Sequence, residues 1–239
     1  ETGSTNADLL RVARDGGPEQ VLGADHQTAG RGRMGRVWEA PPGASLLCSV
    51  LVRPPAGSLD PHVVTTALGL AAAEAVEAVT GVAVGIKWPN DLVAGTSDAP
   101  DDRKLAGVLA ESTVVDGRVD AVVAGIGVNV NWPDGFPDEL AATAVSLRQL
   151  VGADVDRTDL VVAMLRRLEV HLADPSRVRD AVAERSATIG RTVRVERGDG
   201  SVVGLATGLT ADGRLVLDVD GTLHEISVGD VVHLRPTDG

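Results

Sequence analysis

The stretch SLLCSVLV, Ser45–Val52, is a short apolar run that predicts a buried strand. A helix is predicted soon after it, because Asp60 is a good N-cap and Pro61 suits the first helical turn. The helix continues through TALGLAAAEAVEAV and ends at Gly81, a residue suited to the left-handed conformation of a helix C-terminus. A strand followed by a long helix indicates a domain that contains both α and β structure.

The elements predicted around this pair extend the same pattern. Further strands are expected at residues 21–26, 82–87, 105–112 and 118–128. Apolar residues at helical spacing, including Leu160, Met164 and Leu168, predict a helix with one buried face at residues 158–172. Other helices are expected at 176–187 and directly after the segment GSTN at 3–6, and residues 96–103 (TSDAPDDR) are expected to form an acidic loop.

From Ile189 onward, short alternating runs replace the helical spacing. The runs are residues 193–195, 202–205, 215–219 and 223–227. Asp-Gly dipeptides at 199–200, 212–213 and 220–221 separate them, as in tight hairpin turns. We therefore expect a small β-barrel of about 50 residues. Its boundary is placed near Thr188, which divides the chain into an α/β domain at 1–187 and a barrel domain at 188–239.

Composition excludes several classes of protein. The single Cys48 excludes an internal disulfide framework and a site built from several cysteines. The net charge of −12 disfavours nonspecific nucleic-acid binding, which depends on excess positive charge. The longest uncharged runs have 13 residues, against about 20 for a membrane span. The first residues show no basic and apolar leader, so we expect neither a signal peptide nor membrane contact.

Rare residues indicate where the chemistry lies. Lys87 and Lys104 are the only lysines among 22 basic residues, and the chain has four asparagines and three tryptophans. All nine occur within the first 132 positions. A composition that merely replaces Lys by Arg would scatter these exceptions. We therefore expect the functional site in the first part of the chain.

The segment QTAGRGRMGRVW, residues 27–38, alternates glycines with arginines. Glycines let backbone N–H groups approach an anion, and arginines are permanently charged donors suited to phosphate or carboxylate. The segment matches neither the Walker loop nor the dinucleotide fingerprint. A flexible, solvated loop is the alternative, so the prediction of an anion site depends on the density of arginines.

Two segments contain the lysines. KWPND, residues 87–91, ends a predicted strand, and its Asn90 and Asp91 supply the hard oxygen ligands that Mg²⁺ prefers. An ordinary β-turn is the alternative there. KLAGVLAES, residues 104–112, places Lys104 where a loop meets a strand. A compact ammonium there can serve two oxyanions as charge shifts between them, and a solvated surface lysine is the alternative.

Two further segments carry amides. GIGVNVNW, residues 125–132, ends a strand, and its Asn129 amide could read the edge of an adenine. A buried amide that satisfies a turn is the alternative. GSTN could bind a small polar group, or act only as a helix N-cap.

Taken together and in this order, GSTN, QTAGRGRMGRVW, KWPND, KLAGVLAE and GIGVNVN resemble the biotin protein ligases, in an actinobacterial-like monofunctional form. The resemblance implies an α+β fold: a mixed β-sheet flanked by helices, as in class II aminoacyl-tRNA synthetases, with a C-terminal SH3-like barrel. It implies a cytoplasmic enzyme that uses ATP and Mg²⁺ to convert biotin to biotinyl-5'-AMP and pyrophosphate. The enzyme would then transfer biotin to a specific lysine of a biotin carboxyl carrier protein.

The resemblance also implies roles for individual residues. The catalytic residues would be Lys104, Arg31 and Arg33. Biotin would contact Ser4, Thr5, Asn6, Gln27, Gly30, Arg31, Gly32, Arg33 and Lys104. ATP would contact Arg36, Trp38, Lys87, Asn90, Asp91 and Asn129, and Asn90 with Asp91 would hold Mg²⁺ indirectly. Met34 stands where the family often has a basic or polar residue, so that position is not expected to be essential.

Other functions remain open on sequence grounds. A ligase for lipoate or octanoate is the nearest alternative, although GSTN and Gln27 suit a polar ureido group better than an alkyl chain. A biotin-sensing repressor would need a DNA-binding domain, which we do not expect from the charge or from the start of the chain. A nucleic-acid adaptor is disfavoured by the net charge and by the scarcity of aromatic residues for stacking.

Overall fold

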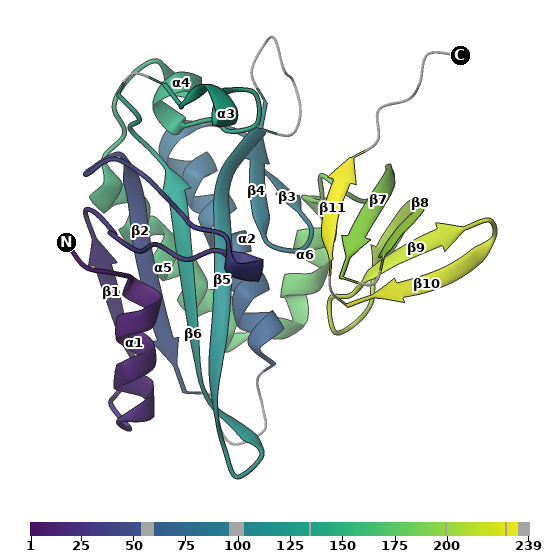
Figure 1. Cartoon of the computed structure of the whole chain (residues 1–239), viewed down its shortest axis with the longest axis horizontal. Helices are drawn as coiled ribbons and strands as arrows, with labels where there is room; N and C mark the ends of the chain where they lie inside the picture. Colours follow the sequence, from purple (N-terminus) through teal and green to yellow (C-terminus); the bar gives the residue numbers. More distant parts are fainter. Residues whose placement is uncertain (54–59, 96–102, 134, 199, 228, 234–239) are drawn as a thin grey trace.

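The computed structural model describes residues 1–53, 60–95, 103–133, 135–198, 200–227 and 229–233. These residues form two β-sheets, of which the larger is flanked by helices and the smaller lies at the C-terminal end (Figure 1). Most of the predicted acidic loop at 96–103, and Asp199 of one predicted turn, lie outside the described residues.

The larger sheet has six strands in the order β1-β2-β6-β5-β4-β3. Their bounds are β1 Gln20–Ala24, β2 Ser45–Val52, β3 Gly85–Lys87, β4 Asp91–Ala94, β5 Arg103–Val115 and β6 Arg118–Asn129. Every pairing between neighbours is antiparallel, so the prediction of a mixed sheet was wrong. The connections explain this arrangement. Strands β3, β4, β5 and β6 follow one another in the chain and pair with their chain neighbours, as in a series of hairpins. Helix α2 connects β2 to β3 at the opposite edge of the sheet.

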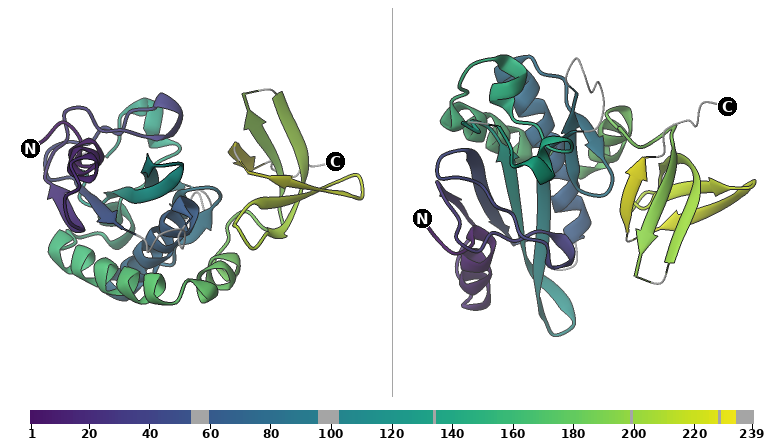
Figure 2. Two further views of the ribbon diagram at one scale, coloured as in Figure 1. Left: turned by 90° about the horizontal axis from the view of Figure 1, so that it is seen from below. Right: turned by 45° about the horizontal axis from the view of Figure 1, so that its top comes forward.

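Helices cover the two faces of this sheet unequally (Figure 2). One face packs against α2 (Pro61–Thr80), with α5 (Arg157–Ala173) and α6 (Val178–Glu184) behind it, and this is the main core. The other face packs against α1 (Thr5–Arg14), near β2 and β6. Alternate residues of β6 serve the two faces: Ile126 belongs to the main core, while Gly125 and Gly127 face the opposite side. That second face is left open beyond the end of α1.

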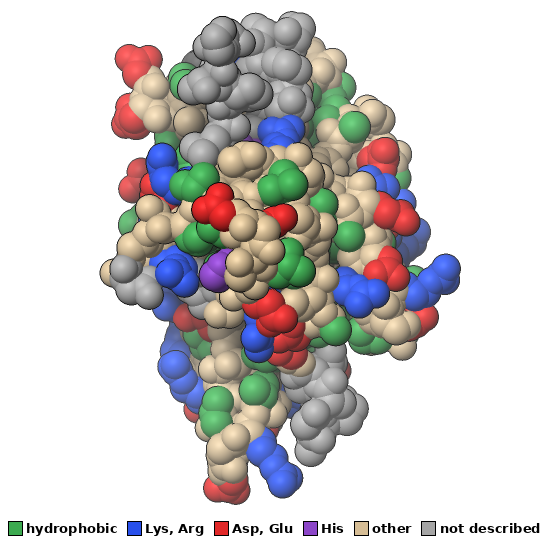
Figure 3. All heavy atoms as spheres, turned by 90° about the vertical axis from the view of Figure 1, so that its right-hand side faces the viewer, with side chains coloured by type: hydrophobic (Ala, Val, Ile, Leu, Met, Phe, Trp, Pro, Cys, Tyr) green, Lys and Arg blue, Asp and Glu red, His purple; other side chains and the backbone are tan. Residues whose placement is uncertain are grey.

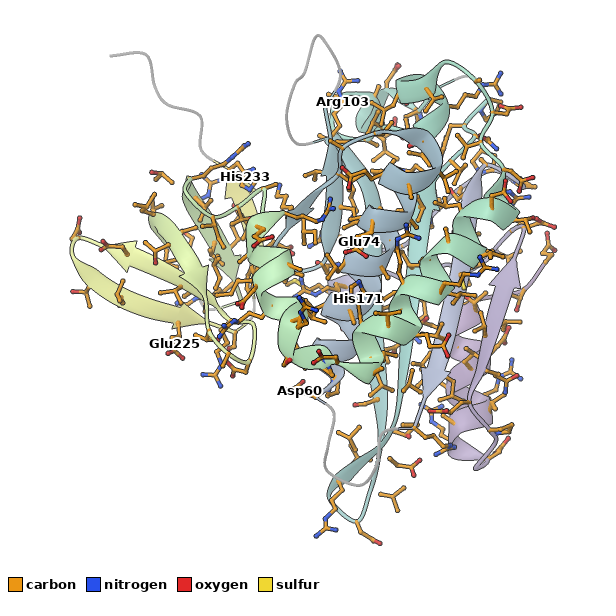
Figure 4. All side chains as sticks on the ribbon, turned by 180° about the vertical axis from the view of Figure 1, so that it is seen from behind. Asp60, Glu74, Arg103, His171, Glu225 and His233 are labelled. Carbon is orange, nitrogen blue, oxygen red and sulfur yellow. The ribbon has the colours of Figure 1, made fainter. Side chains whose placement is uncertain are left out.

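Helix α2 begins and ends as its capping residues predict. Asp60 accepts a hydrogen bond from His62 N at 2.8 Å, and Gly81 ends the helix with a φ of +74°. Among the described helices, α2 alone has the length and apolar composition of a membrane span, but 56% of its most apolar window is buried within the protein. Glu74 of α2 also points toward His171 of α5, with 2.9 Å between Oε2 and Nε2 (Figure 4). These contacts are those of a core helix.

Short elements complete the first part of the chain. They are η1 (Arg33–Gly35), α3 (Asp138–Ala141), α4 (Leu147–Val151) and η2 (Pro175–Arg177). None of the three elements α3, α4 and β4 was predicted from the sequence. The predicted helix at 176–187 is divided into η2 and the shorter α6, and the strand predicted at 82–87 forms only over Gly85–Lys87.

The smaller sheet has five antiparallel strands in the order β10-β9-β8-β7-β11. Their bounds are β7 Thr192–Arg197, β8 Gly200–Leu209, β9 Leu215–Val219, β10 Thr222–Ile226 and β11 Asp230–His233. The sequence predicted the first four but not β11. Trp88, which precedes β4 in the first part of the chain, is buried in the core of this sheet beside Leu215 and Leu217. On the C-terminal side of the molecule, acidic and basic side chains are interspersed (Figure 3).

Candidate active site

Three glycines make room for a site on the open face of the large sheet. A Cβ atom at Gly125 would lie 2.9 Å from both Asn6 Cγ and Ser49 Oγ, and closer still to Asn6 Oδ1. At Gly127 it would lie 2.8 Å from Trp38 Nε1, and at Gly107 it would lie 3.1 Å from Lys104 Nζ. Such approaches are possible only where no side chain is present. The glycines therefore let α1, the arginine segment and Lys104 converge on the strands.

A polar network lies at the start of α1. Thr5 N and Thr5 Oγ1 both donate to Gln27 Oε1, at 2.7 and 2.9 Å. Thr5 Oγ1 also lies 2.7 Å from Ser49 Oγ, which in turn donates to Asn6 Oδ1 at 2.6 Å. The hydroxyls of Thr5 and Ser49 carry only two protons for these three oxygen–oxygen contacts. The four side-chain oxygens therefore have acceptor capacity left for a ligand. These residues line a cavity that suits a small ligand with N–H donors.

The amide of Asn6 extends this network to a charged pair. Asn6 Nδ2 donates to Leu109 O at 3.1 Å and to Glu111 Oε2 at 3.2 Å. The other carboxylate oxygen of Glu111 lies 2.8 Å from Arg31 NH2. The first cavity is thus connected through Asn6 and Glu111 to the first arginine of the glycine-rich segment.

A second, larger cavity adjoins the first and is strongly charged. Five cationic side chains line it: Arg31, Arg33, Arg36, Lys87 and Lys104. Three carboxylates also line it: Asp91, Glu196 and Asp230. An excess of positive charge in a concave site is suited to a polyanion.

Lys104, Asp91 and Asn90 form the floor of this cavity. Lys104 Nζ lies 2.7 Å from Asp91 Oδ1. Asn90 donates through Nδ2 to Val108 O at 2.8 Å and accepts from Arg33 NH1 at 3.0 Å. Burial lowers the pKa of the Arg33 guanidinium, while the Asp91 carboxylate acts in the opposite direction. The KWPND turn therefore places one amide and one carboxylate directly beside the predicted catalytic lysine.

The arginine segment folds as a small hairpin over the sheet. Trp38 N donates to Gly30 O at 3.1 Å, and Gly32 N donates to Arg36 O at 2.7 Å. Gly30 is required at the base, because a Cβ there would overlap the carbonyl oxygen of Trp38. The indole of Trp38 lies over Gly127, with Lys104 Nζ 5.7 Å from its ring centroid. Within the described residues its buried Nε1 has no hydrogen-bond partner.

The two cavities meet at four residues that line both: Arg31, Trp38, Gly107 and Leu109. The first cavity offers neutral acceptors and the second offers cations. A ligand in one cavity can therefore reach a ligand in the other at this junction, beside Lys104. Such an arrangement can hold two substrates with their reacting groups in contact.

Most of the predicted site residues line the two cavities; the exceptions are Gly30, at the base of the arginine hairpin, and Asn129. Asn129 is buried and lines neither cavity: its Nδ2 donates to Lys104 O at 3.3 Å and its Oδ1 accepts from Trp132 Nε1 at 3.1 Å. Its placement is that of a buried structural amide, and the expected contact with adenine is not supported. Arg36 lines the second cavity but pairs with Asp230 of β11 in the smaller sheet.

The structure adds site residues that the sequence did not reveal. Six of them line a cavity: Ser49, Gly107, Leu109, Gly125, Gly127 and Asp230. The seventh is Glu111, which contacts Asn6 and Arg31. One signal was available: small residues at alternate positions of predicted strands often mark the close approach of another backbone or a ligand. Within the described ranges, no group of three or more His, Cys, Asp or Glu side chains is placed to hold a metal.

Comparisons with known proteins agree over nearly the whole chain. Residues 17–129 match the biotin/lipoate A/B protein ligase family, and residues 188–234 match the biotin protein ligase C terminal domain. The chain is 42% identical to a Mycobacterium tuberculosis protein named biotin–[acetyl-CoA-carboxylase] ligase, over 98% of this chain and 87% of that protein. It is 32% identical to the Bacillus subtilis bifunctional ligase/repressor BirA, over 95% of this chain and 70% of that one.

A solved structure gives the same result. The biotin protein ligase from Aquifex aeolicus, in complex with biotin and ATP, is similar to this chain with a TM-score of 0.82 and 28% identity. The match covers 98% of this chain and 96% of that one.

Proposed function

Because the chain belongs to the biotin protein ligase family, we propose that it activates biotin with ATP and then transfers biotin to a carrier protein. The first half-reaction forms biotinyl-5'-AMP and releases pyrophosphate. The second joins biotin to a lysine of a biotin carboxyl carrier protein, the acceptor implied by relatives named for acetyl-CoA carboxylase.

The junction of the two cavities is the observation that carries this proposal. The acceptor-rich cavity around Thr5, Asn6 and Ser49 suits the ureido N–H groups of biotin. The cationic cavity suits a triphosphate. The biotin carboxylate and the α-phosphorus of ATP would then meet at the junction, between Arg31 and Lys104.

The chemistry of the first step is an attack by one anion on another. A carboxylate oxygen of biotin forms a bond to the α-phosphorus, and the bond from that phosphorus to pyrophosphate breaks. Lys104, Arg31 and Arg33 lie at the cavities and would stabilise the charge that develops in the transition state. The Lys104 ammonium can leave Asp91 for the reacting oxygens, because it is a compact charge on a flexible stem.

The remaining roles follow from the same geometry. Asn90 and Asp91 would hold Mg²⁺ indirectly, through its waters, since Mg²⁺ typically keeps several waters and binds one or two carboxylates together with substrate phosphates. When bound, Mg²⁺ would neutralise charge on those phosphates. Arg36 and Lys87 would contact phosphate, and the Trp38 ring would cover the nucleotide. In the second step the lysine amine of the acceptor attacks the carbonyl carbon of the adenylate and AMP leaves.

The arginine hairpin would also protect the intermediate. An acyl-adenylate is readily hydrolysed, so a segment that closes over it and excludes water raises the yield of transfer. Gly30 and Gly32 allow the tight hairpin that places Arg31 and Arg33 at the two cavities.

We further propose how the chain is divided into domains and which fold each domain has. Residues 1–187 would form a catalytic domain related to class II aminoacyl-tRNA synthetases, and residues 188–239 a barrel of the SH3-like type. A cytoplasmic location would give the enzyme ATP and its carboxylase acceptor.

Exchange of labelled pyrophosphate into ATP tests the proposal. Exchange that depends on biotin and is not supported by lipoate is expected, because Thr5, Asn6 and Ser49 offer acceptors for ureido N–H groups that lipoate lacks. Lipoate-dependent exchange would favour the alternative ligase, and no exchange with either acid would refute the proposed activation step.

A further inference from the structure

A carboxylate of the smaller sheet reaches into the cationic cavity. Asp230, the first residue of β11, forms an ion pair with Arg36. Its other oxygen lies 4.0 Å from Arg33 NH1. Both arginines belong to the hairpin that covers the site, and Asp230 itself lines the cavity with Val231 and Val232. This is a direct link between the smaller sheet and the arginine hairpin.

A second link fixes the position of the smaller sheet. Trp88 of the KWPND turn is 6% exposed and packs in the core of that sheet. Its Nε1 donates to Gly213 O at 3.1 Å, and its backbone N–H donates to Thr188 Oγ1 at 3.1 Å. Its chain neighbours in KWPND line the cationic cavity. The turn that forms the cavity floor is therefore anchored in the smaller sheet, which holds β11 beside the cavity.

The charges show how Asp230 can act. A carboxylate in direct contact with a triphosphate would repel it, so Asp230 is unsuited to binding the substrate itself. Each guanidinium has five N–H donors. An arginine that donates one or two of these N–H groups to Asp230 still has others that can bind phosphate. Arg33 already divides its donors in this way, because NH1 donates to Asn90 and also lies near Asp230.

We propose that Asp230 is a positioning residue that holds the arginine hairpin over the cavity, through Arg36 and Arg33, in the orientation that binds the phosphates. Through this carboxylate the smaller sheet helps to shape the nucleotide site, without Asp230 itself binding the phosphates. This inference rests on the proposed function, since it assumes that the cavity takes the triphosphate of ATP.

Three variants test the inference by exchange kinetics. Asp230→Asn keeps the shape of the side chain and removes its charge, while Asp230→Glu keeps the charge. Glu225→Gln is the matched control, because Glu225 of β10 in the same sheet (Figure 4) pairs with Arg214 at 3.3 Å and lines neither cavity. We expect Asp230→Asn to raise the KM for ATP about tenfold, the effect of losing one charge-assisted hydrogen bond, with biotin affinity unchanged. Asp230→Glu should restore most of the ATP affinity, and the control should match wild type.

A second measurement needs no catalysis. Trypsin cleaves after Arg31, Arg33 and Arg36, and Arg118 in the exposed β5–β6 hairpin serves as an internal reference. In Asp230→Asn, cleavage in the arginine hairpin relative to cleavage at Arg118 is expected to rise several-fold. An unchanged cleavage ratio, or a KM for ATP that stays the same or falls, would overturn the inference. If wild type itself lacks biotin-dependent exchange, the proposed function fails, whereas the cleavage ratio still decides whether Asp230 holds the hairpin.

Discussion

Gly125→Ala should damage the biotin pocket more than the fold. The added carbon would lie 2.9 Å from Asn6 Cγ and 2.9 Å from Ser49 Oγ, so Asn6 must move. Its hydrogen bonds from Ser49 and to Glu111 would then be lost or distorted. The displaced Asn6 and Ser49 would then lose their hydrogen bonds to biotin, and two such bonds correspond to about 2–3 kcal/mol, or roughly a 30- to 150-fold increase in the Kd for biotin. Overpacking costs about 1–3 kcal/mol of the usual 5–15 kcal/mol of stability, so the variant should fold.

Isothermal titration of biotin, with thermal unfolding measured in parallel, tests this expectation. Gly23→Ala is the matched control in the same sheet, because the nearest atom to its new Cβ is Leu47 O at 3.7 Å, an ordinary contact. The control should bind biotin as wild type does. A folded Gly125→Ala variant whose Kd for biotin stays within twofold of wild type would refute the placement of biotin beside Asn6 and Ser49.

The remaining predictions concern three other residues. Lys104→Ala should abolish biotin-dependent exchange of pyrophosphate while the protein stays folded, and near wild-type exchange would remove Lys104 from the catalytic group. Arg33→Ala should release biotinyl-adenylate faster in a chase with excess biotin, because the hairpin loses its bond to Asn90; unchanged release would contradict this. Burial raises the pKa of the Cys48 thiol to about 12, so folding stability should fall as pH rises above 9, where the unfolded thiol ionises. Denaturant unfolding at increasing pH should show this loss in wild type and not in Cys48→Ala.

The sequence predicted best the elements with strong local signals. Ser45–Val52 forms β2 as expected, and α2 starts and ends at its predicted caps, Asp60 and Gly81. The sequences of the short strands β4 and β11 contain little that predicts a strand. These strands are stabilised by pairing with β5 and β7, and the local sequence does not predict such pairing. The mixed sheet was expected from resemblance, and only the strand connections show why it is antiparallel.

The candidate site divides in the same way. Rare lysines and a run of arginines marked the cationic cavity, which binds anions and which the structure brings together around Lys104 and Asp91. Ser49 and Glu111 were missed because, within apolar strands, single polar residues give no sign of facing α1. Asn129 was expected to contact a nucleotide, but its amide is engaged by Trp132 and by the backbone of Lys104. Contacts between residues far apart in the chain decided each of these cases.

A two-step transfer experiment tests the central claim most directly. The enzyme is incubated with biotin and MgATP, freed of unbound substrates by gel filtration, and mixed with a biotin carboxyl carrier domain without further ATP. We expect one biotin on the carrier lysine per enzyme-bound adenylate, detected by intact mass, and none when ATP is omitted from the first step. A carrier that stays unmodified although the enzyme has bound both substrates would contradict the assignment of these two adjoining cavities to biotin activation and transfer.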